Sequence, residues 1–156
     1  MSPIRETIKG REVWSVHEQI GFAVSCMLYN RNYSLFPVLG IQFWTEYAIQ
    51  HQQIKFLFDR GGSPLAYITW AYLGADTEKR LLKETNFRLH PSEWDEDGST
   101  WLLDFCCKPG FGRKVIEHFL LLQPWGEGEV HWLNRKKKIM TFRPHREYKM
   151  PGGARA

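Results

Sequence analysis

One segment constrains the fold of this chain more than any other: residues 101–122, in which an apolar run passes through glycines into a helical pattern. Residues 101–107 are apolar apart from Asp104, which indicates a buried strand. A tight glycine-rich turn follows at 109–112, and residues 113–122 carry apolar side chains at helical spacing. A strand, a tight turn and a helix in this order require a sheet with a helix packed against it.

A change of hydrophobic period defines the other elements. Helical spacing gives way near residue 54 to alternation rich in β-branched and aromatic residues, so helices precede strands along the chain. The expected elements are helices over 11–29 and 36–50, a hairpin of strands 54–58 and 65–73, a charged helix over 77–85 capped by Asp76 or Thr77, an acidic loop at 91–99, and strands near 129–133 and 137–143. Their order predicts an α+β or α/β sheet with helices on its faces.

The composition favours one folded domain. The chain has 156 residues, of which 43% are hydrophobic and 15% aromatic, and this composition excludes a disordered polypeptide. We expect a flexible N-terminus at 1–10, a single domain over 11–145 and a flexible basic tail at 146–156. No run reaches the roughly 18 apolar residues of a membrane span, and the N-terminal residues lack the apolar core of a signal peptide, so we expect a cytoplasmic protein.

The net charge of +4 is concentrated towards the C-terminus. Eight of the 21 Lys and Arg residues, but only one of the 17 acidic residues, lie from Asn134 onward. The densest run consists of Arg135, Lys136, Lys137 and Lys138. Such a patch can attract nucleic acid, a membrane surface or an acidic protein, and a solvated tail that aids solubility explains it equally well.

The cysteines and histidines give no catalytic or metal-binding pattern. Cys26, Cys106 and Cys107 lack the spaced pairs of a zinc site and cannot form a disulfide framework. The six histidines show no close pairing and no serine–histidine–aspartate order. Cys107 as a nucleophile is less favoured than Cys107 as a buried structural thiol. We therefore expect no metal centre.

Two features of the central segment indicate chemistry. Asp104 is a carboxylate within an apolar strand; it faces the core or a pocket, lies on the solvated face of an edge strand, or pairs with an arginine. The turn that follows opens a helix, where free backbone N–H groups, the helix dipole and two cations can hold an anion. It resembles the pyrophosphate loop of GNAT acetyltransferases, which reads Arg/Gln-x-x-Gly-x-Gly/Ala between a strand and a helix. The candidate residues in this turn are Gly110, Phe111, Gly112, Arg113 and Lys114.

Four segments together resemble the RTX toxin-activating lysine acyltransferases, bacterial enzymes that transfer a fatty acyl chain from acyl carrier protein to internal lysines of a pore-forming protoxin. Residues 64–73 resemble the family's Pro-Val-Ala-Tyr-x-x-Trp-Ala strand, and 101–105 its Trp-x-Ile-Asp-x strand, whose Asp is catalytic. Residues 110–112 stand where the family has Ala-Pro-Phe-Gly, and 135–142 are similar to its late Lys-Val-x-x-Phe strand. The resemblance covers roughly residues 15–143 and implies a GNAT-like α+β fold, in which helices flank a central, mostly antiparallel sheet.

This sequence differs from the family at one essential residue. The family has a histidine after the first helix, shortly before an aromatic-Pro-Val motif. Residues 36–38 supply Phe-Pro-Val, but Tyr33 stands at the matching upstream position, and no histidine lies between His17 and His51. The resemblance therefore implies Tyr33 and Asp104 as the catalytic residues. Tyr33 would act as an acid towards the departing thiolate, while Asp104 would orient the tyrosine or hold the incoming lysine.

The same resemblance implies the donor and the partners. Acyl carrier protein would dock on the basic residues 135–138 and present a phosphopantetheine thioester to the 110–114 loop, with no permanently bound cofactor. The acceptor would be a lysine of a protein such as an RTX protoxin, and a homodimer is a further assembly to test. Two alternatives stay open: a catalytically silent relative that binds an acylated or lysine-bearing partner, and a basic nucleic-acid-binding module. The latter is disfavoured because interleaved aromatic and basic residues are not evident.

Overall fold

A five-stranded sheet with helices on both faces forms the body of the computed structural model, which describes residues 4–8 and 13–144. The strands lie in the order β1-β2-β3-β4-β5, and all neighbours are antiparallel except β3 and β4. This is the mostly antiparallel α+β architecture that the resemblance implied. The elements are α1 (Val16–Leu28), α2 (Val38–Gly40), the π-helix η1 (Ile41–Glu46), α3 (Tyr47–Gln50), β1 (Ile54–Phe58), β2 (Pro64–Leu73), α4 (Ala75–Lys83), the 3₁₀-helix η2 (Pro91–Glu93), β3 (Ser99–Cys107), α5 (Gly112–Leu122), β4 (Val130–Leu133) and β5 (Ile139–Phe142).

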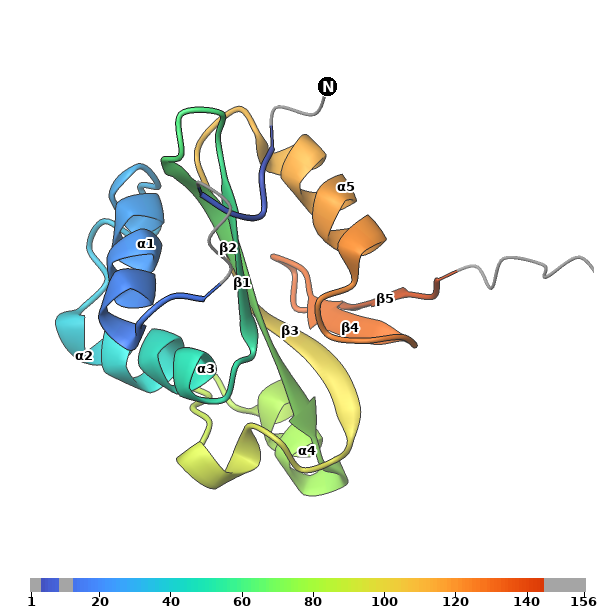
Figure 1. Cartoon of the computed structure of the whole chain (residues 1–156). Helices are drawn as coiled ribbons and strands as arrows, with labels where there is room; N and C mark the ends of the chain where they lie inside the picture. Colours follow the sequence, from blue (N-terminus) through green and yellow to red (C-terminus); the bar gives the residue numbers. More distant parts are fainter. Residues whose placement is uncertain (1–3, 9–12, 145–156) are drawn as a thin grey trace, which may run out of the picture.

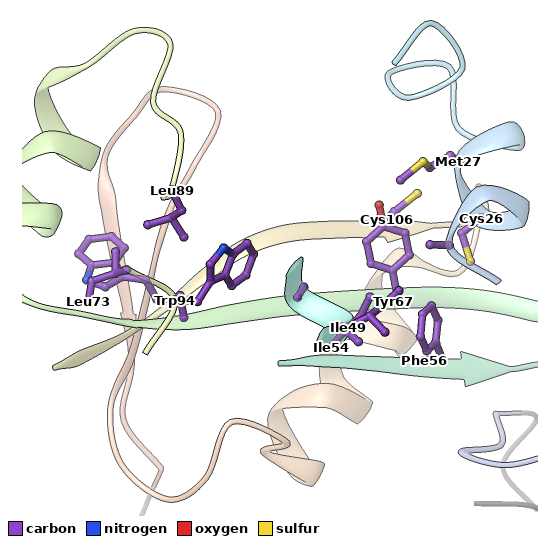
Figure 2. Packing of buried hydrophobic residues seen from close by; sticks show 14 of the residues in the cluster. Cys26, Met27, Ile49, Ile54, Phe56, Tyr67, Leu73, Leu89, Trp94 and Cys106 are labelled. Carbon is purple, nitrogen blue, oxygen red and sulfur yellow. The ribbon is translucent and has the colours of Figure 1, made fainter. Parts of the chain in front are cut away.

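Two apolar cores lie on the two faces of the sheet. α1, α2 and α3 cover one face and α5 covers the other (Figure 1). Tyr67 and Cys106 point into the first core, whereas Ile68 and Cys107 point into the second, as expected for strands whose side chains alternate between faces. Each large side chain buried in this way contributes about 1.5–3 kcal/mol to folding. Figure 2 shows part of the first core, including Tyr67 beside Cys106.

The expected helices are present, with shifted ends. α1 begins at Val16 because Ser15 and Glu18 form a capping box, in which each side chain accepts a hydrogen bond from the other residue's backbone N–H. α4 begins two residues before the expected position, with Gly74 as its N-cap instead of Asp76 or Thr77. The expected helix over 36–50 contains the π-helical turns of η1, which residue spacing did not indicate. None of the described helices is both long and apolar enough to cross a membrane.

The N-terminal segment is more ordered than expected. Arg5 exchanges two backbone hydrogen bonds with Phe58 at the outer edge of β1, with N···O distances of 2.8 and 2.7 Å. Ile4 is buried in the second core. Within the expected flexible terminus at 1–10, residues 4–8 thus contact the sheet through an apolar side chain and the edge of β1. The expected tail at 146–156 lies outside the described residues.

The central strand β3 has two irregularities that position the candidate site. It pairs with the parallel strand β4 only at Thr100↔Val130 and Trp101↔His131, although β3 itself continues to Cys107. Its pairing with β2 is also interrupted, because Thr69 and Trp70 of β2 oppose Asp104 and Leu102. The residue between them, Leu103, is therefore the extra residue of a β-bulge. Beyond residue 101, β3 is paired on one side only.

Candidate functional site

Asp104 lies between two tyrosine hydroxyl groups that come from separate parts of the chain. Tyr33, in the turn after α1, donates its hydroxyl to Asp104 Oδ1. Tyr67, on β2, donates its hydroxyl to Asp104 Oδ2 at 2.9 Å. The Tyr33 hydroxyl also lies 3.3 Å from the backbone oxygen of Phe105. The structure thus brings together Tyr33 and Asp104, the two residues implicated by the resemblance, and adds Tyr67.

The β-bulge determines which face of the sheet carries the carboxylate. Regular alternation would place Asp104 on the same face as Leu102, towards α5. The extra residue resets the alternation, so Leu103 packs against the α1-side core and Asp104 reaches the tyrosines of that side. Leu102 and Phe105, on either side of this pair, pack against the α5-side core. The bulge is therefore the local reason that Asp104 meets Tyr33 and Tyr67.

Burial and hydrogen bonding act on the ionisation of this cluster in opposite directions. Burial raises the pKa of Asp104 above its usual range, while the hydrogen bonds from Tyr33 and Tyr67 act to lower it. The pKa values of Tyr33 and Tyr67 are raised, chiefly by burial and then by the nearby Asp104 charge. Both phenols therefore stay protonated at neutral pH and act as hydrogen-bond donors. Asp104 is thus the acceptor of the cluster, and burial raises its pKa from the acidic range.

An apolar cavity of about 220 Å³ opens where β3 and β4 diverge, and Asp104 forms part of its wall. The other lining side chains are all apolar and come from β2, β3, α5, β4 and the loop before β4: Ile68, Leu102, Leu103, Phe105, Ile116, Phe119, Leu120, Trp125, Trp132 and Leu133. A cavity with this lining suits a hydrocarbon chain, because it offers apolar contact over most of its surface. Asp104 is the one charged residue among the described residues that line this cavity.

The glycine turn after β3 leads directly into α5. Gly110 has a φ of +88°, which favours glycine, and Phe111 is the N-cap of α5. No described side chain caps this helix, so its first N–H groups can bind a ligand. Lys114 is exposed, whereas the exposed Arg113 is paired with Glu117 at 3.2 Å. Among the described residues, no hydrogen bond joins residues 110–114 to Asp104 or Tyr33, so the turn forms a separate part of the site.

The basic run Arg135, Lys136, Lys137 and Lys138 forms the exposed turn between β4 and β5. The Asn134 side chain shapes this turn, accepting hydrogen bonds from the backbone N–H groups of residues 136 and 138 at 2.9 and 3.0 Å. Because β4 runs parallel to β3, this turn extends towards the same end of the sheet as the glycine turn. Both turns follow strands that run in the same direction through the sheet.

Tyr67 and the cavity are the parts of the site that sequence reasoning did not identify. Tyr67 lies within the resembling segment 64–73, but residue type alone did not show that its hydroxyl meets Asp104. The cavity depends on the divergence of β3 and β4, and the bulge at Leu103 depends on pairing with β2; neither is a local pattern. The alternatives for Asp104 of a solvated position and of an arginine partner are wrong, because its two carboxylate oxygens accept hydrogen bonds from the phenols of Tyr33 and Tyr67.

Comparison with known proteins shows which sequences this chain resembles. The model of the RTX toxin acyltransferase family matches residues 12–143. Relatives include the leukotoxin-activating lysine-acyltransferase LktC serotype A1 of Mannheimia haemolytica, 38% identical over 70 residues (45% of this chain and 41% of that protein). The RTX-II toxin-activating lysine-acyltransferase ApxIIC of Actinobacillus pleuropneumoniae is 30% identical over 91 residues (58% and 56%). The matches thus span about two-fifths to just over half of these relatives' length.

A solved structure supports the fold independently. The loading GNATL domain of CurA from Lyngbya majuscula superposes with a TM-score of 0.53 at 14% identity, covering 84% of this chain and 63% of that one. At this identity the likeness concerns the fold alone, and it makes the α+β fold GNAT-like. Since the family model covers most of the described structure, including Tyr33, Tyr67 and Asp104, the chain belongs to the RTX toxin acyltransferase family.

Proposed function

We propose that this chain is a protein-lysine acyltransferase that moves a fatty acyl group from the phosphopantetheine thioester of acyl carrier protein to a lysine of a protein target. The observation that carries the proposal is the position of Asp104, held by Tyr33 and Tyr67 in the wall of an apolar cavity. The cavity suits the acyl chain, and the carboxylate suits the amine that attacks it. Family membership and the names of the relatives support the same reaction.

The reaction needs a neutral amine and a protonated leaving group. In the proposed mechanism, Asp104 accepts a proton from the lysine ammonium, and its raised pKa makes it a better base than an exposed carboxylate. The lysine nitrogen then forms a bond to the acyl carbon as the carbon–sulfur bond breaks. The nitrogen loses a second proton and the thiolate gains one, relayed through Asp104 and Tyr33. The products are an amide and a thiol, and the first proton passes to solvent.

In this proposal, the acyl donor and its carrier protein would bind separate parts of the molecule. The apolar cavity would hold the acyl chain, and the N-terminus of α5 with residues 110–114 would hold the phosphopantetheine phosphate. The exposed turn 135–138 would attract acyl carrier protein, which is acidic. The acceptor would be an RTX protoxin or a similar protein in the cytoplasm. The homodimer stays a prediction.

One observation favours a second candidate function, that of a catalytically silent relative that binds an acylated or lysine-bearing partner. The family's histidine is replaced by Tyr33, whose hydroxyl is bonded to Asp104 and whose pKa is raised. Such a protein would bind acyl carrier protein or the acceptor without transferring the acyl group.

A transfer assay distinguishes the two. The full chain is incubated with palmitoyl-acyl carrier protein and a purified RTX protoxin, and the lysines are analysed by mass spectrometry. We expect lysine acylation by the wild type, a loss of roughly 10²–10⁴-fold in Asp104→Asn, and unchanged transfer in Asp76→Asn, which removes an exposed carboxylate from α4. Donor binding without acylation by the wild type would favour the silent relative, and equal transfer by both variants would exclude Asp104 from the chemistry.

A further inference from the structure

Tyr67 is the most deeply buried of the three polar side chains Tyr33, Tyr67 and Asp104. It lies on β2, next to the central strand, and is fully buried. Its backbone is paired with Cys106 of β3, and its ring lies 6.1 Å from the ring of Phe56 on β1. Figure 2 shows the ring beside Cys106, with Phe56 nearby. The strands on both sides therefore fix the position of the hydroxyl.

The two phenols that hold Asp104 differ in their support. Tyr33 comes from a turn, is only half-buried, and has an aromatic neighbour in Phe36 at 6.0 Å. Tyr67 bonds to Oδ2 and Tyr33 to Oδ1, so each carboxylate oxygen has its own donor. A carboxylate has about four lone-pair sites, and two donors on different oxygens fix its plane while leaving acceptor sites unused. Tyr67 is the donor that stays in place if the turn carrying Tyr33 shifts.

We propose that Tyr67 is the positioning residue of this site, which fixes the Asp104 carboxylate through its hydroxyl so that an unused lone pair faces the amine bound at the cavity. The role rests on the proposed acyltransferase function and extends it to a residue that acts through Asp104. Tyr67 itself does not touch the substrate. Its hydroxyl proton is already donated to Oδ2, and its raised pKa keeps that proton in place.

The groups that face Asp104 are few. Tyr33 approaches from the turn after α1, Tyr67 from β2, and the Cys106 thiol and the Phe105 backbone N–H from β3 itself. The side chains that α5 and β4 contribute to the cavity wall are apolar, and no described Lys or Arg forms an ion pair with Asp104. Hydrogen bonding by the phenols is thus the main effect that opposes burial. Removing the Tyr67 hydroxyl should therefore raise the pKa of Asp104 further.

The experiment compares Tyr67→Phe with Tyr72→Phe. Tyr72 is a matched control because it lies on the same strand, and its hydroxyl donates to the Trp125 backbone oxygen at 2.8 Å instead of to Asp104. In Tyr67→Phe we expect kcat near neutral pH to fall by roughly 10–100-fold, the range for a hydrogen bond to a charged group, with KM for the acyl donor changed by less than about 3-fold. The acidic limb of the pH–rate profile should move to higher pH in Tyr67→Phe and keep its position in Tyr72→Phe. An unmoved acidic limb in Tyr67→Phe would overturn the proposal.

A titration of the unliganded protein separates this inference from the proposed reaction. The carboxyl carbons are labelled with ¹³C, and the Asp104 signal is assigned by its loss in Asp104→Asn. We expect Asp104 to titrate at higher pH in Tyr67→Phe than in the wild type and Tyr72→Phe; equal titration in all three would refute the role of Tyr67, even for a chain without transferase activity. If Tyr67→Phe does not fold, the ring Cζ signal of Tyr67 in the wild type supplies the test. The chemical shift of this carbon should change with pH as Asp104 titrates, and this change should be absent in Asp104→Asn. A Tyr67 chemical shift that does not change as Asp104 titrates would exclude the contact.

Discussion

The chemistry of this site depends on how a carboxylate is held without a cation. Among the described residues, Asp104 has two phenol donors and no arginine or lysine partner, so its ionisation reflects burial against hydrogen bonding. Burial prevails and the pKa of Asp104 is raised. A carboxylate of this kind is a stronger base than an exposed one, but its charge costs stability at neutral pH. Function and stability therefore oppose each other at this residue.

That opposition gives a prediction for stability. Because the folded-state pKa of Asp104 is raised, the stability it contributes is fully present below its unfolded pKa of about 3.9 and is lost as pH rises through the folded-state value. Asp104→Asn cannot ionise, so it does not lose stability in this way. As pH rises from 4 to 7, the free energy of unfolding of Asp104→Asn should therefore increase relative to that of the wild type. Urea unfolding at several pH values measures it, and Asp76→Asn, at an exposed position, should lack this trend. A difference that does not grow with pH would contradict the raised pKa.

Tyr33 stands where the family has a histidine, and its substitution tests whether its hydroxyl matters to transfer. Tyr33→Phe should cut acyl transfer by roughly 10²–10⁴-fold while the fold remains intact, because the variant loses an acid–base group that donates to Asp104. Tyr33→His should retain or raise activity, since imidazole has a pKa near 6.5. Tyr29→Phe is the matched control, because Tyr29 is exposed and its ring, which lies under Lys108, is kept. Full transfer by Tyr33→Phe would assign the acid to another group or to water.

At the scale of elements, the site exists because β3 is irregular. Its bulge at Leu103 directs Asp104 to the tyrosines, and its divergence from β4 opens the cavity. The sequence predicted the strand, the glycine turn and α5, because each is a local pattern of residue types. It could not predict the bulge or the divergence, since both depend on which residues of neighbouring strands are paired. Asp104 was found as an anomaly in an apolar run, whereas Tyr67 looked like any other aromatic residue of a buried strand.

The glycine turn before α5 offers a test at this scale. Gly110 has a φ of +88° and open space around its Cα, so Gly110→Ala should destabilise the fold by about 1–2 kcal/mol through backbone strain alone. Gly21→Ala is the matched control, because Gly21 lies within α1 and also has open space. That variant should stabilise the fold by about 0.4–1 kcal/mol. Chemical unfolding measures both, and equal effects would show that the φ of Gly110 is not required.

The same pair tests the use of the turn in donor binding. If the backbone N–H groups at the start of α5 hold the phosphopantetheine phosphate, a strained turn should raise KM for acyl-acyl carrier protein by roughly 3–30-fold, because about 1–2 kcal/mol of ordering is lost. Gly21→Ala should leave this KM unchanged. Steady-state transfer at varied donor concentration checks it. An unchanged KM in a destabilised Gly110→Ala variant would place the donor phosphate elsewhere.

At the scale of the whole molecule, the basic turn 135–138 and the acidic loop 91–99 lie towards opposite ends of β3. The glycine turn and the basic turn 135–138 lie at the end of the sheet to which β3 and β4 run. α4 and the acidic loop 91–99 lie near the other end of β3, with α4 far from the start of α5 (Figure 1). An acidic carrier approaching this field would be oriented with its pantetheine arm towards the cavity. Docking of acyl carrier protein on the basic turn stays a prediction, and so does the alternative of a solvated surface.

Charge reversal at the basic turn tests this orientation. Arg135→Glu combined with Lys137→Glu should slow association with acyl carrier protein and flatten its dependence on ionic strength, because exposed charges steer encounter more than they hold the complex. Lys79→Glu combined with Lys83→Glu changes the net charge by the same amount on α4, at the other end of the sheet. If net charge alone governed encounter, the two double variants would associate equally slowly. If the basic turn is the docking surface, only the 135/137 variant should associate more slowly than the wild type. The dissociation rate and the free energy of unfolding should be nearly unchanged in both variants. Stopped-flow association rates at about 20 and 200 mM salt decide between them, and wild-type rates for the 135/137 variant at low salt would place the docking surface elsewhere on the molecule.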